Sequence, residues 1–90
     1  MNELQYGQLV KSKAGRDKDK IFVITDIKGE YVYLADGILR RIENPKQKKI
    51  KHIQPINYII QEIKDKLIRD KKVTNLEIRR HLAVYNEDQS

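Results

Sequence analysis

The 90-residue sequence contains no cysteine and no long hydrophobic run. Without cysteine, the chain can form neither a disulfide framework nor a thiolate metal site. Its first ten residues lack an apolar segment of the length of a secretory signal. No stretch approaches the roughly 20 apolar residues that are needed to cross a bilayer. We therefore expect a soluble, cytoplasmic protein that makes no contact with a membrane.

Residue patterns typical of catalysis are also missing from the sequence. There is no glycine-rich phosphate loop, no cluster of histidines and carboxylates at metal-ligand spacing, and no serine with a matched base. The two histidines, His52 and His81, stand apart, and we expect them on the surface of a strand and of a helix. The sequence therefore predicts a protein that is not an enzyme, has no small-molecule substrate, and uses no metal or other cofactor.

What the sequence has in excess is positive charge. Nineteen lysines and arginines face thirteen acidic residues, and the net charge is +6. The excess is uneven, because residues 1–55 carry twelve basic and seven acidic side chains, whereas residues 56–90 carry seven and six. Clustered cations attract phosphate backbones and release their counterions. The charge therefore favours a nucleic-acid partner, although a lysine-rich surface can also serve solubility alone.

Five short strands are expected in the first part of the chain, at 8–12, 21–27, 30–35, 38–43 and 49–54. The segment Ile21–Ile24 is an apolar run rich in β-branched residues, and Asp36–Gly37 is a strong hairpin signal. Asn44–Pro45 should end the fourth strand, because proline lacks a backbone donor. Short strands separated by frequent turns are typical of a small barrel. We expect residues 1–55 to form one that is closed or half-closed.

Two helices are expected in residues 56–90, at about 56–69 and 75–84, and we expect both to pack on the barrel. A stripe at helical spacing marks the first helix, and it consists of Ile56, Ile59, Ile60, Ile63 and Leu67. Pro55 is well placed near the start of this helix, because the first helical positions need no amide donor. Thr74 and Glu77 match the capping box that begins a helix. Residues 86–90 are expected to form a frayed tail.

The stretch from Tyr6 to Ile24 resembles the KOW motif, in which two strands flank a charged loop around a near-invariant glycine, here Gly15. Leu34–Gly37 also matches an apolar-Asp-Gly turn of one large-subunit ribosomal protein family of archaea and eukaryotes. Nearly the whole chain is similar to small bacterial KOW-domain RNA-binding proteins related to that family. They share an "SKAGRD" loop, an "ADG" turn, an "LRR" segment and a lysine-rich stretch ending in a proline. The resemblance implies an SH3-like barrel that binds RNA, often ribosomal RNA, and thus a role in translation.

One loop position departs from the family pattern. The family loop often has a second glycine just before the lysine that starts the next strand, and here Asp19 precedes Lys20. Aspartate reaches left-handed φ values less easily than glycine does, and it adds a negative charge. Either the loop geometry is relaxed at this point, or the backbone approaches RNA less closely there.

The candidate RNA-binding residues lie in the loop and in the basic segment that follows. Gly15 allows close approach of a phosphate, although a tight hairpin alone would also need a glycine. The full set of candidates is Lys11, Lys13, Gly15, Arg16, Lys18, Lys20, Arg40, Arg41, Lys46, Lys48, Lys49 and Lys51. Tyr31 and Tyr33 share one face of a strand and could stack unpaired bases. The preferred interpretation is that this pair packs beneath the C-terminal helix.

Three functions stay open on the sequence alone. The leading one is a monomeric, non-enzymatic protein that binds ribosomal RNA or the ribosome. The second is an SH3-like protein-interaction module of the transcription or translation machinery. The third is DNA binding by the two C-terminal helices as a helix-turn-helix, with Arg79 and Arg80 on the second helix. The nearly balanced charge of residues 56–90 argues against the third.

Overall fold

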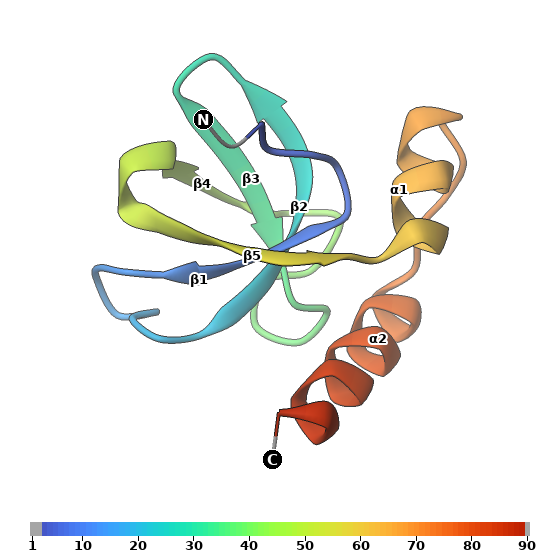
Figure 1. Ribbon diagram of the computed structural model, residues 1–90. Coiled ribbons are helices and arrows are strands. Elements are labelled where there is room, and N and C mark those ends of the chain that lie inside the picture. Colours follow the sequence, from blue (N-terminus) through green and yellow to red (C-terminus); the bar gives the residue numbers. More distant parts are fainter. Residues whose placement is uncertain (1–2, 90) are drawn as a thin grey trace.

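The computed structural model describes residues 3–89, which form five strands followed by two helices (Figure 1). The elements are β1 (Gln8–Ser12), β2 (Ile21–Lys28), β3 (Tyr31–Ala35), β4 (Lys46–Lys49), a 3-10 turn η1 (Ile50–His52), β5 (Ile53–Ile59), α1 (Gln61–Ile68) and α2 (Asn75–Asp88). All strand pairings are antiparallel, in the order β4-β3-β2-β1-β5. The described strands therefore form an open sheet whose edges are β4 and β5. The predicted class, mainly β with two C-terminal helices, is confirmed.

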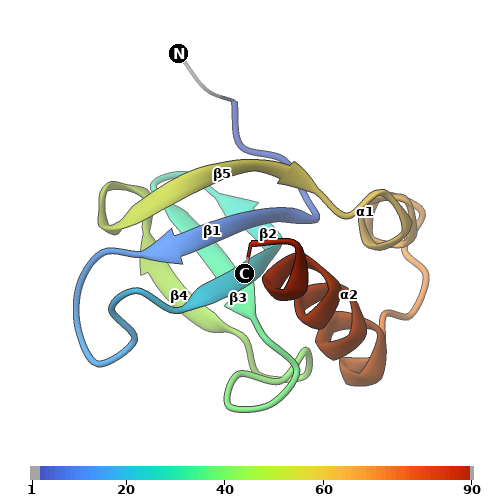
Figure 2. The ribbon, with the colours of Figure 1, turned by 60° about the horizontal axis from the view of Figure 1, so that its bottom comes forward.

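The sheet curves around an apolar cluster on one of its faces (Figure 2). This cluster unites buried side chains of β1, β2, β3 and β5, namely Val10, Phe22, Ile24, Val32, Leu34 and Ile53. Phe22, from the apolar run Ile21–Ile24, is only 1% exposed. Because four strands contribute to one cluster, the loops at their ends are held at fixed positions.

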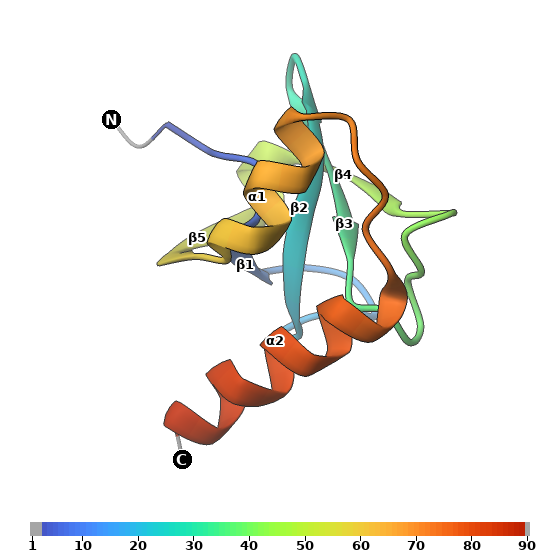
Figure 3. The same ribbon diagram turned by 90° about the vertical axis from the view of Figure 1, so that its right-hand side faces the viewer.

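Both helices cover the opposite face of the sheet (Figure 3). There Leu9, Val23 and Ala35 of the sheet pack against Ile63 of α1 and Ile78 of α2. The rings of Tyr58 in β5 and Tyr85 in α2 meet edge to face, with their centroids 4.9 Å apart. Lys66 of α1 donates to Glu77 of α2, which joins the two helices. The sheet and the helices therefore share one core.

The first helix begins later than the sequence predicts. Residues 56–59 belong to β5, where Ile59 pairs with Gln8 and Pro55 pairs with Val10, so a helix from residue 56 is wrong. The apolar spacing suits a helix, but the β-branched residues of the same segment suit a strand. Pairing with β1 decides between them. Proline is tolerated because β5 is an edge strand, and α1 starts only at Gln61.

The predicted fourth strand, 38–43, is also wrong, because residues 36–45 form an irregular segment between β3 and β4. The carboxylate of Asp36 accepts hydrogen bonds from the amides of Ile38, at 2.9 Å, and Arg40, at 2.8 Å. A strand would need such amides for its ladder, so the aspartate competes with sheet formation. The actual fourth strand is Lys46–Lys49, and the predicted strand 49–54 divides into its end, η1 and the start of β5.

The start of the second helix is confirmed. The Thr74 hydroxyl accepts from the amide of Glu77, and the Glu77 carboxylate accepts from the amide of Thr74. The helix continues to Asp88, beyond the expected end at about Val84, so the frayed tail expected at 86–90 is wrong for residues 86–88. Within residues 3–89, neither helix has the length and apolarity that crossing a membrane requires.

Candidate nucleic-acid interface

The loop between β1 and β2, residues 13–20, is closed by backbone hydrogen bonds. The amide of Ser12 donates to the carbonyl oxygen of Lys20 at 3.0 Å, and the amide of Asp19 donates to the carbonyl oxygen of Ser12 at 2.8 Å. Asp19 adopts a left-handed φ of 71°, a conformation that glycine reaches more easily. The departure from the family pattern therefore leaves the chain in a glycine-like conformation at this position. The negative charge of Asp19 is exposed.

Gly15 occupies the exposed outer part of this loop with a φ of 79°. A Cβ at this position would meet only Lys48 Nζ, at 3.8 Å, so space around the residue is ample. The need for glycine is therefore conformational. The absence of a side chain also leaves the backbone accessible at this position.

Asp17 clamps the loop to the basic segment that follows β3. The residue is 6% exposed, and its Oδ2 lies 2.5 Å from Lys46 Nζ and 4.0 Å from Arg40 Nη2. The close contact with the Lys46 ammonium lowers the pKa of Asp17 below its ordinary value, although burial opposes this shift. The carboxylate is thus ionised at neutral pH and holds two cations beside the loop.

Lys48 makes a second link between the loop and β4. Its Nζ donates to the carbonyl oxygen of Ala14 at 2.7 Å. Burial lowers the pKa of Lys48, and the neighbouring charges of Lys46 and Arg40 lower it further, against the attraction of Asp17. Burial is the largest of these effects, so Lys48 is a partly desolvated cation that an approaching anion would stabilise.

The structure therefore gathers six predicted cations into one surface, which we call the loop–β4 surface. It consists of Lys13, Arg16, Lys18, Arg40, Lys46 and Lys48. The first three are exposed, and among residues 3–89 no carboxylate lies within ion-pair distance of them. Lys51 lies in η1 next to this surface, because the amide of Lys13 donates to the carbonyl of His52 at 2.9 Å.

Other predicted cations lie elsewhere. Lys11 pairs with Ile21 and so shares the helix-covered face of the sheet. Arg41 forms an exposed ion pair with Glu43 at 3.1 Å. Arg40 and Arg41 fall within the predicted strand 38–43, but they belong to the irregular segment 36–45. Lys20 lines a separate pocket beside α2.

Tyr31 and Tyr33 lie on the outer face of the β3–β4 edge. Tyr31 pairs with Lys49 and Tyr33 with Gln47, so Lys49 shares this face with both rings. Lys28 Nζ lies 5.4 Å from the centroid of the Tyr33 ring. Neither tyrosine belongs to the cluster beneath the helices, which cover Ala35 at the end of the same strand. The preferred interpretation, packing beneath the C-terminal helix, is therefore wrong.

Sequence reasoning missed Asp17, the residue that organises the loop–β4 surface. The available signal was an acidic side chain inside a strongly basic loop, which also fits a solvated surface. It missed as well that Arg79 of α2 donates to the carbonyl of Gly37 at 2.9 Å. This bond fixes the basic segment from its other side, so the helices help to position Arg40.

Within residues 3–89, no group of three histidine or carboxylate side chains could hold a metal ion. Neither a scan against protein-family models nor a search of curated proteins gives a match to this chain. The resemblance to KOW proteins therefore stays a prediction. The geometry of the charged surface is the main ground on which function can be argued.

Proposed function

We propose that this chain is a non-enzymatic RNA-binding protein that holds phosphates on the loop–β4 surface. We also propose that its curved sheet is an SH3-like barrel of the KOW type, and that it acts in the cytoplasm on ribosomal RNA or the ribosome. The strand order, with β1 between β2 and β5, and the 3-10 turn before β5 are compatible with such a barrel.

The observation that carries the proposal is the joining of two basic segments that are separate in the sequence. Asp17 and the Ala14 carbonyl bind Lys46 and Lys48, so the later lysines stand beside the loop cations. The later lysines are thereby held against the loop that carries Lys13, Arg16 and Lys18. Fixed cations lose little conformational freedom when a phosphate binds, and this favours affinity.

The two kinds of cation have different tasks in this proposal. Exposed Lys13, Arg16 and Lys18 meet phosphates directly and release counterions on binding. Lys46 and Lys48 are committed to Asp17 and to the loop backbone, so they add to the field and shape the loop. Gly15 lets a phosphate approach the backbone between them.

DNA recognition by a helix-turn-helix is less well supported. In that motif the second helix presents its first turns to the major groove. Here Ile78 is buried against the sheet and Arg79 is bonded to the carbonyl of Gly37. The first turns of α2 are therefore occupied by contacts within the chain.

The test is the salt dependence of RNA affinity for a triple variant, Lys13→Ala/Arg16→Ala/Lys18→Ala. We expect the slope of log affinity against log salt to fall by about 2–3, because each lost phosphate contact removes about 0.7–0.9 from it. Fluorescence anisotropy with a labelled ribosomal RNA fragment between about 50 and 200 mM salt measures this slope. An equal length of duplex DNA serves for comparison.

A matched control carries the same charge change on exposed residues outside the surface, as Lys71→Ala/Lys72→Ala/Arg80→Ala. We expect this control to change the slope by less than one unit, roughly the value of one contact. Equal slopes for both triple variants would mean that net charge alone attracts RNA and would contradict the proposed surface. Co-sedimentation of the wild type with ribosomes at low salt, lost at high salt, would support the ribosomal assignment.

A further inference from the structure

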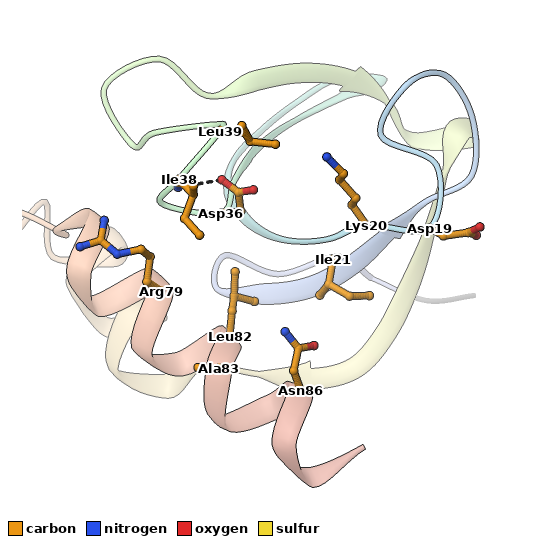
Figure 4. Close-up of a pocket in the computed structure, with 10 residues that line it drawn as sticks. All are labelled: Asp19, Lys20, Ile21, Asp36, Ile38, Leu39, Arg79, Leu82, Ala83 and Asn86. Atoms are coloured by element: carbon orange, nitrogen blue, oxygen red, sulfur yellow. Dashed lines mark hydrogen bonds between the residues drawn. The ribbon is translucent and has the colours of Figure 1, made fainter. Parts of the chain in front are cut away.

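An apolar pocket of about 480 Å³ lies next to the loop–β4 surface, between the 36–45 segment and α2 (Figure 4). Ile38 and Leu39 border it on one side, and Leu82 and Ala83 of α2 border it on the other. Ile21 of β2 lies between them. The pocket is therefore built by three parts of the chain that are distant in the sequence.

The apolar rim of this pocket, Ile38 and Leu39, is exposed to solvent although its backbone is fixed by hydrogen bonds. Ile38 is 64% exposed and Leu39 is 65% exposed, which is unusual for two adjacent aliphatic side chains. Their backbone is fixed on one side by the Asp36 carboxylate, which accepts from the amides of Ile38 and Arg40. On the other side Arg79 donates to the carbonyl of Gly37. The exposure therefore belongs to an ordered segment and not to a loose loop.

Gly37 explains why the segment stays in this position. Its φ is 80°, and a Cβ there would lie 2.5 Å from the carbonyl oxygen of Asn75, at the start of α2. The backbone of the segment therefore packs directly on the helix. Ile38 and Leu39, which follow Gly37 directly, therefore lie across the pocket from Leu82.

The charge around the pocket is suited to an anionic ligand with an apolar part. Lys20 and Arg79 stand at its edge, and Arg40, next to Leu39 in sequence, belongs to the loop–β4 surface through Asp17. The acidic side chains at the pocket are Asp19, which points away from Lys20, and Asp36, whose carboxylate accepts backbone amides. The pocket therefore adjoins the loop–β4 surface through Lys20, at the end of the loop, and through Leu39, next to Arg40.

We propose that this pocket takes an unpaired base of the RNA that is bound on the loop–β4 surface. The inference rests on the proposed function and specifies its substrate class as RNA with single-stranded or bulged nucleotides. Unstacked bases are the parts of RNA that proteins bind in apolar slots, whereas paired bases are inaccessible in the narrow groove of the duplex. Leu39 and Leu82 would contact the base, and Lys20 the adjacent phosphate.

The experiment compares two RNA probes, a single strand of about 12 mixed nucleotides and a fully paired duplex of the same sequence. The variant Ile38→Ser/Leu39→Ser removes the apolar rim and changes no charge, and its exposed positions leave the core intact. Val84→Ser is the matched control, because Val84 is 51% exposed on α2 and does not line this pocket. The melting temperature of each variant is recorded first, to show that it is folded.

We expect the double variant to lose about tenfold in affinity for the single strand, the effect of exposing two apolar contacts. Its affinity for the duplex, and the salt slope on both probes, should stay at the wild-type values, and the control should match the wild type. An equal loss on both probes would contradict a base contact. Unchanged affinity on both probes would place the pocket outside the RNA interface and leave a protein ligand as its occupant.

These outcomes separate the two proposals. If the wild type shows no salt-dependent RNA binding, the proposed function itself fails. If the wild type binds RNA with the expected salt slope but Ile38→Ser/Leu39→Ser binds both probes as tightly as the wild type, the proposed function stands and the base pocket is wrong.

Discussion

Two carboxylates anchor the 36–45 segment, and their surroundings are opposite. Asp17 approaches from the loop and holds Arg40 and Lys46 while its side chain is 9% exposed. Glu43 holds Arg41 and accepts from the side-chain Nδ2 of Asn75 while its own side chain is 60% exposed. Both have a lowered pKa, Asp17 chiefly through Lys46 and Glu43 chiefly through Asn75. The same kind of contact between a carboxylate and a cation is therefore nearly buried at Asp17 and exposed to solvent at Glu43.

The difference in burial determines how much each carboxylate contributes to the free energy of unfolding. An exposed ion pair contributes little because water and salt screen it. A carboxylate that is nearly buried is costly to leave without its partner, because it has lost most of its own solvation. The comparison teaches that the loop–β4 surface depends on Asp17, whereas Glu43 adds a contact that solvent can replace.

The largest effect is expected for Asp17→Asn. This change removes the charge that holds Lys46 and Arg40, and we expect the free energy of unfolding to fall by about 2–3 kcal/mol. The value lies below that of a fully buried pair because the Lys46 side chain is 25% exposed. Urea denaturation measures it. A loss of less than about 0.5 kcal/mol would place Asp17 among ordinary surface residues and break the comparison.

A smaller loss is expected when both partners change, as in Asp17→Asn/Lys46→Met. The methionine fills the space of the lysine stem and needs no counter-charge, so about 1–2 kcal/mol of the loss should be recovered. A double-mutant cycle with Lys46→Met alone gives the coupling energy. Strict additivity of the two single changes would show that the two side chains do not interact in solution.

The dependence of stability on pH provides a further test of the Asp17 carboxylate. Because the pKa of Asp17 is lowered from 3.8 on folding, its contribution is complete well above pH 3.8 and disappears as pH falls through the folded value. We expect the stability difference between wild type and Asp17→Asn to be constant near neutral pH and to shrink below pH 3.8. Glu77, whose pKa is also lowered, is present in both proteins and cancels in this difference. A difference that stays constant down to the lowest pH would contradict an ionised Asp17.

The smallest effect is expected for Glu43→Gln. The glutamine can still accept from Asn75, and solvent replaces the lost ion pair with Arg41. We expect its denaturation midpoint to match that of the wild type within experimental error, at low and at high salt. A clear loss that disappears at high salt would show that Glu43 is more than a surface anchor.

The sequence predicts the fold where local signals and pairing agree. Strands β1, β2 and β3 follow from apolar runs and turn residues, and α2 follows from the capping box of Thr74 and Glu77. It fails at Ile56–Ile59, where the spacing fits a helix and pairing with β1 fixes a strand. It fails again after Asp36, whose carboxylate takes amides that a strand would use.

For the candidate site, the sequence indicates the cations but not their grouping. The sequence shows Lys46 and Lys48 as basic residues. Their positions, however, depend on contacts with Asp17 and Ala14, which lie in the loop between β1 and β2. The separation of Lys11 and Arg41 from this group likewise depends on pairing and on a local ion pair. Contacts of this kind come from tertiary structure, which the order of residues along the chain leaves open.

The contact between Gly37 and the first turn of α2 has a consequence for the order of events during synthesis. The 36–45 segment is fixed by Arg79 and by the Asn75 side chain, which accepts from the amide of Ile42. These anchors leave the ribosome after all the cations of the loop–β4 surface. A nascent chain that has exposed every one of those cations therefore still lacks the support that orients Arg40. Under the proposed function, we therefore expect the contribution of Arg40 to RNA affinity to appear only when α2 docks on the 36–45 segment.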